Sequence, residues 1–110
     1  MKSGVDIIAM MDNAVPQLCA VCGKQMEYHP EKGYYGDFAH LLNNTKSHRS
    51  YYGSALISSK HNGLPVCSDN QNKCNNSIGV NRSSQPVLAD RIAVKIAAMD
   101  ANDRMGENNE

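Results

Sequence analysis

Two cysteine pairs decide the fold, Cys19-Ala20-Val21-Cys22 and Cys67-Ser68-Asp69-Asn70-Gln71-Asn72-Lys73-Cys74. Zinc prefers four thiolate ligands at about 2.3 Å, and a closed set of four is typical of a structural site. The first pair, followed by Gly23 and Lys24, has the spacing of a zinc knuckle. The second pair is looser, because its intervening segment exceeds the usual two to four residues. We therefore predict one structural zinc ion bound by Cys19, Cys22, Cys67 and Cys74.

Two other uses of four cysteines explain the sequence less well. A secreted disulfide framework needs an export signal, and the early apolar run Ile7–Met11 is short and bounded by Asp6 and Asp12. A thioredoxin-type redox pair would use Cys19 and Cys22 and leave the other two cysteines without a role. We therefore expect zinc-bound thiolates in a reducing cytoplasm, and no membrane-spanning segment.

The composition indicates one small domain with a thin apolar core. The chain has 110 residues, no Trp, one Phe and a mean hydropathy of -0.51. A chain of this length is near the lower end of what buries a useful core unaided. A metal ion that ties distant segments together would add directly to the folding free energy.

The net charge is zero, but the charges are unevenly distributed. No Asp or Glu occurs from Phe38 through Ser68, whereas this segment contains three basic residues and three histidines. A surface that faces phosphates needs such a segment without acids. Chance clustering on a solvated loop explains the same pattern. The basic residues concerned are Lys46, Arg49 and Lys60.

Hydrophobic spacing predicts helices at both ends of the chain. Val5, Ile8, Met11 and Val15 recur at helical spacing, with Ser3 as a candidate cap. Near the C-terminus, Val87–Met99 reads as the clearest helix, with an apolar stripe on one face. The stripe consists of Leu88, Ile92, Ile96 and Met99, which would brace the zinc module or form a homodimer face.

The segment between the helices reads as short strands and turns. We expect strands at Gln25–Tyr28 and Tyr34–Leu42 around a turn at His29–Gly33, and a tight turn at His61-Asn62-Gly63. We expect a polar loop at Asn43–Ser50, and a short helix after Cys74. The expected single domain thus divides into an N-terminal helix with its lead-in (1–18), a zinc-containing core (19–80), a C-terminal helix (86–104) and a frayed tail (105–110).

The order of these residues resembles the HNH endonucleases, the ββα-metal nucleases, in the subset that has a four-cysteine zinc. The motif comprises a Cys-x2-Cys pair, a strand ending in His40, a loop, Asn62 before an apolar step into the second pair, and Asn75 directly after the last cysteine. It covers Cys19 to about Val80. Ala39-His40 and the basic loop that follows, which contains Tyr and Gly, look most like small phage-encoded recombination endonucleases.

The resemblance implies a fold, a reaction and a set of residue roles. The fold would be α+β, a small zinc-stapled treble clef containing the ββα-metal motif, with flanking N- and C-terminal helices. The activity would be metal-dependent hydrolysis of DNA phosphodiester bonds in the host cell. His40 would be the general base, Asn62 would hold the loop in shape, and Asn75 would bind the catalytic Mg²⁺ or Mn²⁺.

One departure from the family concerns the catalytic metal. Many members have an acidic residue directly before the catalytic histidine, where this chain has Ala39. The nearest acid, Asp37, points to the opposite face of a regular strand from His40 unless a bulge re-aims it. The candidate ligands are therefore Asn75, Asp37 and His61, with His48 as another candidate. Alternatively, the ion is held weakly through water and phosphate.

Each of these residues has a simpler explanation when taken alone. His40 would be a core or surface histidine, Asn62 the asparagine of an Asn-Gly turn, and Asn75 a helix cap. The missing acid beside His40 favours an alternative function, a non-catalytic zinc module that binds nucleic acid or protein.

The basic and aromatic residues of the middle segment are assignable only by class. Lys46, Arg49 and Lys60 would contact the phosphates of duplex or branched DNA, without reading sequence. Tyr51 and Tyr52 are candidates for stacking on exposed bases.

Overall fold

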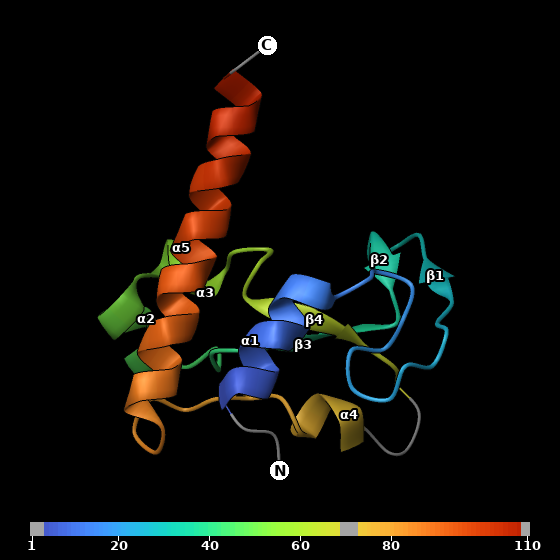
Figure 1. Cartoon of the computed structure of the whole chain (residues 1–110), viewed down its shortest axis with the longest axis horizontal. Coiled ribbons are helices and arrows are strands. Elements are labelled where there is room, and N and C mark those ends of the chain that lie inside the picture. Colours follow the sequence, from blue (N-terminus) through green and yellow to red (C-terminus); the bar gives the residue numbers. More distant parts are fainter. Residues whose placement is uncertain (1–3, 69–72, 109–110) are drawn as a thin grey trace. The chain divides into compact units, whose positions relative to one another are not determined.

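The computed structural model describes residues 4–68 and 73–108 (Figure 1). It confirms a small α+β fold, with helices and two antiparallel sheets of two strands each. The chain divides into two compact units, which we describe separately. The first contains the described residues within Met1–Leu41 and Gly63–Gly79, and the second those within Leu42–Asn62 and Val80–Glu110.

The first unit contains one helix of three turns, both sheets and one short helix. Its elements are α1 (Gly4–Asn13), β1 (Tyr28–His29), β2 (Tyr34–Tyr35), β3 (Asp37–His40), β4 (Gly63–Val66) and α4 (Lys73–Asn76). Its buried apolar side chains come from all parts of the unit: Ile7, Met11, Met26, Ala39, Leu41, Leu64, Val66 and Ile78. The cysteines Cys19, Cys67 and Cys74 are buried with them.

The N-terminal helix is shorter than expected. It ends at Asn13, so Val15 lies beyond it and is 40% exposed, whereas Ile7 and Met11 are buried. Pro16 explains the early end, because the residue before a proline is disfavoured in the helical region. The expected cap Ser3 lies outside the described residues.

The expected strand Tyr34–Leu42 is divided into β2 and β3 at Gly36. Gly36 has a φ of +56°, and a β-carbon there would collide with the Met26 side chain and the Val66 carbonyl oxygen. Only glycine fits this turn between strands. The preceding turn is confirmed, because the amides of Lys32 and Gly33 both donate to the His29 carbonyl. The strand expected at Gln25–Tyr28 shares only Tyr28 with the observed β1, which comprises Tyr28–His29.

Strands β3 and β4 pair antiparallel in an uninterrupted register from Asp37 opposite Val66 to His40 opposite Gly63. The turn expected at His61-Asn62-Gly63 lies earlier, at Ser59–Asn62, where the Asn62 amide donates to the Ser59 carbonyl. Gly63 instead begins β4, and the Phe38 ring occupies the space of its missing side chain. After β4 the chain reaches α4, which packs against β3.

The second unit is built from three helices. These are α2 (Lys46–Tyr52), α3 (Ser54–Ile57) and α5 (Pro86–Asn108), and α3 contacts α5. The polar loop expected at Asn43–Ser50 is wrong, because α2 begins within it. Thr45 caps this helix, and its Oγ accepts a hydrogen bond of 3.2 Å from the His48 amide. The sequence did not predict this helix because the segment is polar and lacks an apolar stripe. The helix is stabilised instead by its cap and by a buried histidine.

That histidine, His48, is 1% exposed. Its Nε2 accepts a hydrogen bond of 3.1 Å from the Arg82 amide, so the ring is neutral and carries its proton on Nδ1. Nδ1 donates a hydrogen bond of 2.9 Å to Thr45 Oγ. The ring also stacks on Tyr52 at a centroid distance of 6.1 Å. His48 therefore links α2 to the segment before α5, and neither ring nitrogen is free to bind a metal ion.

Helix α5 supplies most of the apolar core of the second unit. Leu88, Ile92 and Ile96 of the expected stripe are buried, together with Ala89 and Ala93. The stripe that we considered as a dimer face is thus largely used within the fold. The helix continues through Asn108 and includes most of the tail that we expected to be frayed. Among the described residues, no helix is long and apolar enough to cross a membrane.

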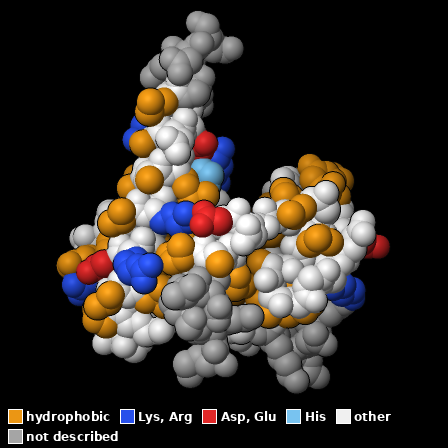
Figure 2. Space-filling model, in the orientation of Figure 1, with side chains coloured by type: hydrophobic (Ala, Val, Ile, Leu, Met, Phe, Trp, Pro, Cys, Tyr) orange, Lys and Arg blue, Asp and Glu red, His pale blue; other side chains and the backbone are white. Residues whose placement is uncertain are grey.

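Hydrophobic side chains also remain exposed on α5 (Figure 2). They are Val87 at 73%, Val94 at 71% and Met105 at 61%.

We predict that His48→Ala destabilises the protein by about 2–4 kcal/mol. The substitution removes two partly buried hydrogen bonds, leaves the Arg82 amide unpaired and opens a cavity. Urea unfolding of the zinc-loaded protein measures the effect. His29→Ala is the matched control, with an expected change within about 0.5 kcal/mol, because His29 is partly exposed and has only a 3.6 Å ion pair with Glu31. Equal stability of the two variants would contradict the structural role of His48.

Candidate functional site

The segment from Cys19 to Lys24 folds back on itself as a knuckle. The Gly23 amide donates to the Cys19 carbonyl at 2.9 Å, and the Cys19 amide donates to the Lys24 carbonyl at 2.8 Å. Gly23 has a φ of +78°, which a side chain would oppose. The Cys22 amide lies 3.5 Å from Cys19 Sγ and points a donor at that sulfur. The backbone therefore presents both thiols of the pair in one direction.

The second cysteine pair meets the first. The sulfur atoms of all four cysteines lie within 4.8 Å of one another, which confirms that the two pairs form one cluster. The Cys22 and Cys67 sulfurs are 3.6 Å apart, and those of Cys67 and Cys74 are 3.7 Å apart. These distances are far too long for disulfide bonds. A tetrahedron with zinc–sulfur bonds of about 2.3 Å has edges of about 3.8 Å, so the thiols fit a zinc ion.

The ionisation of the cluster shows why a cation suits it. Burial disfavours the Cys19 thiolate, but backbone amides of Cys22, Cys67 and Val21 outweigh it and lower the pKa of Cys19 to about 6. Burial raises the pKa of Cys67, and burial together with the neighbouring thiols raises the pKa of Cys74 to about 12. Without a cation, one thiolate therefore opposes the ionisation of the others. A divalent ion such as zinc would offset the repulsion between the thiolates and favour their ionisation.

His40 ends β3 and is half-buried. Its ring meets the Phe38 ring edge-on, at a centroid distance of 5.4 Å and an interplanar angle of 84°. Gly63, its partner in the register, has no side chain. Among the described residues, none forms a hydrogen bond with the imidazole nitrogens of His40. The ring is thus oriented by packing, while its nitrogens remain available to a substrate or water.

The structure relates the other candidate residues of the first unit to His40 in different ways. Asn75 lies on α4, half-buried, and α4 packs against the strand that ends in His40. Asp37 instead begins β3 and pairs with Lys32 at 3.2 Å. Because the β3–β4 register contains no bulge, Asp37 and His40 point to opposite faces of the strand. The structure therefore does not bring Asp37 to His40.

Asn62 is fully buried, and among the described residues its side chain hydrogen-bonds only to backbone groups. Its Oδ1 accepts from the Leu42 amide at 2.8 Å, and its Nδ2 donates to the carbonyls of Leu42 at 3.1 Å and Ile57 at 2.8 Å. One side chain thus closes the loop that starts two residues after His40 and ends just before β4. This is a different role from the exposed Asn-Gly turn that the sequence also allowed.

The basic residues of the second unit have distinct surroundings. Lys46 and Arg49 line a surface cavity of about 370 Å³, together with Asn44, Thr45, Ser50 and Ser54. Arg49 is held in place, because its Nε donates to Asn44 at 2.6 Å and its guanidinium donates to Ser58 at 3.2 Å. The described lining contains two cations and no acid.

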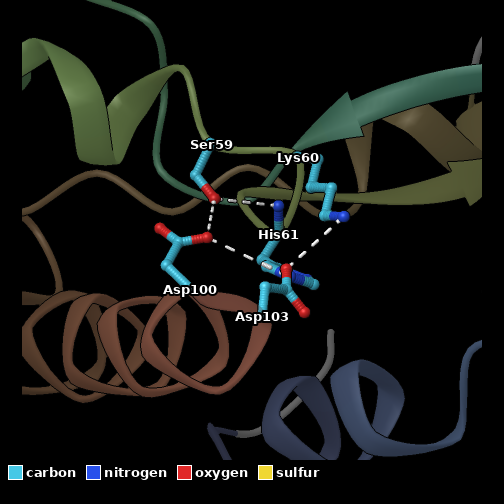
Figure 3. Close-up of polar contacts among 5 residues, drawn as sticks. All are labelled: Ser59, Lys60, His61, Asp100 and Asp103. Carbon is cyan, nitrogen blue, oxygen red and sulfur yellow. Dashed lines mark hydrogen bonds and ion pairs between the residues drawn. The ribbon is translucent and has the colours of Figure 1, made fainter. Parts of the chain in front are cut away.

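Lys60 and His61 form ion pairs with acidic residues of α5 (Figure 3). The sequence analysis did not predict these pairs. Lys60 Nζ lies 3.4 Å from Asp103 Oδ2, and His61 Nε2 lies 2.7 Å from the same oxygen. The hydrogen bond from His61 and the nearby Lys60 hold the pKa of Asp103 below its ordinary value. No sequence signal links residues 60 and 61 to 100 and 103, because only the fold brings them together.

The two tyrosines that we considered for base stacking already have partners. The Arg82 guanidinium lies 3.7 Å from the centroid of the exposed Tyr51 ring, as in a cation–π contact. The Tyr52 hydroxyl donates to Asp90 at 2.6 Å, and burial and this bond raise the pKa of Tyr52.

Comparison with known proteins identifies no relative: no family model, no curated protein and no solved structure matches this chain.

We predict that the purified protein contains one tightly bound zinc ion per chain, and that Cys22→Ser or Cys67→Ser unfolds it. Metal loss and unfolding should be one event, because zinc binding contributes about 10–16 kcal/mol in small zinc domains. Elemental analysis and circular dichroism measure the two effects. Ser68→Ala, an exposed neighbour of the cluster, is the control and should retain zinc and fold. Absence of zinc, or a Cys67→Ser protein with the melting temperature of the parent, would contradict this prediction.

Proposed function

We propose that this protein is a metal-dependent DNA endonuclease of the HNH type, in which the cysteine cluster binds a structural zinc ion and the knuckle, sheets and α4 form a treble clef. The observation that carries the proposal is the Asn62 amide, buried and bonded to the Leu42 backbone on both sides. The resemblance assigns the central asparagine of the motif this role of holding the loop after the catalytic histidine. A chance Asn-Gly turn would leave such an amide at the surface.

The order of elements supports the same proposal. β3 ends in His40, β4 returns antiparallel to it, and α4 follows with Cys74 and Asn75. This strand–strand–helix order is the one that gives the ββα-metal family its name. The cysteine cluster would tie the knuckle to the end of β4 and to α4, because it draws one pair from each side of the motif.

His40 would act as the general base. A ring nitrogen takes a proton from water, the water oxygen bonds to the phosphorus, and the bond from phosphorus to the leaving oxygen breaks. The absence of described hydrogen-bond partners leaves these nitrogens free for water. Packing against Phe38 restricts the ring without consuming a nitrogen. Both features suit a base that must meet water in one orientation.

Asn75 would hold the catalytic ion through its side-chain oxygen, together with phosphate oxygens of the DNA. Mg²⁺ or Mn²⁺ suits such oxygen ligands, and when bound it supplies charge stabilisation at the scissile phosphate. We leave Asp37 out of this set, since it points away from His40, and His61, since its Nε2 is directed at Asp100 and Asp103 of α5 and not at this site. Asn75 would then be the protein's main ligand, which predicts weak ion binding in the absence of DNA.

The cavity lined by Lys46 and Arg49 would bind a phosphate of the DNA backbone. Its hydroxyl and amide groups offer hydrogen bonds to phosphate oxygens, and the fixed guanidinium matches their geometry. Lys60 would contribute less than the sequence suggested, because Asp103 already neutralises part of its charge. Such contacts position duplex or branched DNA without reading its sequence.

A second candidate function is a zinc module that binds nucleic acid and cuts nothing. Ala39 is buried at the position where many HNH enzymes carry a metal-binding acid, and Asp37 does not replace it. This reading retains the cysteine cluster and the basic cavity, but gives His40 no chemical task.

We predict that His40→Ala reduces DNA cleavage by about 10²–10⁴-fold, because the base that activates water is lost. Cleavage of supercoiled plasmid and of a four-way junction, with Mg²⁺ or Mn²⁺ and with EDTA, measures the effect. Zinc content and DNA affinity should stay at parental values. Asn75→Ala should also lose activity, and high Mn²⁺ should restore part of it, since ion binding rather than proton transfer is impaired.

His29→Ala is the matched control and should cut normally. Metal-dependent cutting at the parental rate by His40→Ala would refute the mechanism. Absence of cutting by the parent on both substrates, with DNA binding retained, would favour the non-catalytic module.

We predict that Lys46→Ala with Arg49→Ala weakens DNA binding and lowers the slope of log affinity against log salt by about 1.8, or about 0.9 for each lost phosphate contact. Fluorescence anisotropy over a range of salt concentrations gives the slope. Lys32→Ala with Arg91→Ala removes the same charge elsewhere and is the control. An equal drop in both double variants would mean that net charge, and not this cavity, sets the affinity.

A further inference from the structure

A second cluster of metal-binding groups lies in the second unit, separate in residues from the cysteines. His61 comes from the segment before β4, while Asp100 and Asp103 lie one turn apart on α5 (Figure 3). One ligand atom from each lies within 4.8 Å of the other two. His61 Nε2 is 2.7 Å from Asp103 Oδ2 and 4.0 Å from Asp100 Oδ1. Two separate elements thus direct one imidazole and two carboxylates at a common point.

The spacing is close to what one ion requires. Three ligands bound at about 2.1 Å lie about 3.0–3.4 Å from one another. The two distances from His61 Nε2, 2.7 and 4.0 Å, lie on either side of that range. Small side-chain rotations would therefore bring the three ligand atoms to the spacing that one ion requires. All three are half-buried, which leaves room for water to complete the coordination.

The surroundings hold these groups in position. Ser59 Oγ donates to Asp100 Oδ1 at 2.7 Å and accepts from the His61 amide at 3.1 Å. Ser59 therefore fixes one carboxylate and the backbone of the histidine at once. Such outer partners orient ligands in protein metal sites.

Positively charged and polarised groups already converge on the carboxylates. Lys60 Nζ lies 3.4 Å from Asp103, and its side chain is 75% exposed. Because Lys60 is exposed, it can swing away when a cation enters. By comparison, the ion pair of His29 with Glu31 offers a metal ion one carboxylate instead of two.

We propose that His61, Asp100 and Asp103 form a second, open binding site for a divalent transition-metal ion. The mixed nitrogen and oxygen set suits Mn²⁺ or Zn²⁺ better than the purely oxygen-ligated Ca²⁺ or Mg²⁺. The ion takes the place of the hydrogen bond between His61 Nε2 and Asp103 Oδ2. It joins the Ser59–His61 segment to α5, and this segment leads directly into Asn62.

Manganese is the probe, because it competes poorly with zinc for the thiolates of the cysteine cluster. Zinc-loaded protein without DNA is titrated with Mn²⁺, and electron paramagnetic resonance measures the free ion. Asp100→Asn with Asp103→Asn should weaken binding at this site by about tenfold or more, since loss of even an outer partner costs 10–100-fold. Glu31→Gln, the matched control, should bind as the parent does.

Lys60→Ala gives an independent test, because this exposed residue can be replaced without loss of fold. Removing the competing charge should tighten Mn²⁺ binding about fivefold. Hydrogen exchange should also show that Mn²⁺ protects the amides of residues 57–62 in the parent but not in the double Asp variant.

All variants are also made with Asn75→Ala, so that ion binding at the proposed catalytic site is read separately. Parental Mn²⁺ affinity in the double Asp variant, or no tightening in Lys60→Ala, would overturn the proposal. If the double Asp variant fails to fold, the Lys60→Ala result decides. A protein that cuts no DNA but binds Mn²⁺ through Asp100 and Asp103 would refute the proposed function alone.

Discussion

The convergence of four cysteine sulfurs is the constraint on which the first unit depends. The knuckle at Cys19–Cys22 and the pair Cys67 and Cys74 come from the two separate stretches of chain that form the unit, and their sulfurs meet within 4.8 Å. The intervening sheets are short, with strands of two to four residues. Such strands bury little apolar surface and would be marginal without a cross-link. A bound zinc ion would supply it, because ligation energy adds to folding energy.

The second unit is held together by polar groups as well as by its apolar core. Asn62 and His48 are both buried, and each satisfies backbone groups from distant parts of the unit. A buried polar side chain with all its hydrogen bonds made specifies one arrangement, since any other leaves a donor or acceptor unpaired. These two residues therefore fix the loop after His40, where a small apolar core alone would allow several conformations.

This division of roles gives the proposed nuclease a physical basis. Packing orients His40, whose imidazole nitrogens have no hydrogen-bond partner among the described residues, while Asn62 shapes the loop. The group proposed to react and the group that holds the structure are therefore different residues. The basic cavity of Lys46 and Arg49 would add phosphate binding, since its described lining contains no acid. If the His61 cluster binds an ion as we propose, that ion would fasten the segment that leads into Asn62.

Some features followed from the sequence alone. Cysteine spacing predicted the cluster, because two cysteine pairs spaced in this way are typical of a metal-binding site. Helical spacing predicted the buried stripe of α5, because Leu88, Ile92 and Ile96 fall on one face whatever they pack against. The turn at His29–Gly33 followed from the local chemistry of Pro30 and Gly33.

Other features were decided by tertiary structure. Gly36 divides a strand that its neighbours favour, because Met26 and Val66 leave no space for a side chain. Helix α2 forms in a polar segment because a histidine of that segment finds partners at Thr45 and Arg82. Asp100 and Asp103 meet His61 only because α5 contacts α3 and the segment that follows it. Local pattern determines what a residue favours, whereas contacts between residues far apart in the chain determine which of those preferences the structure retains.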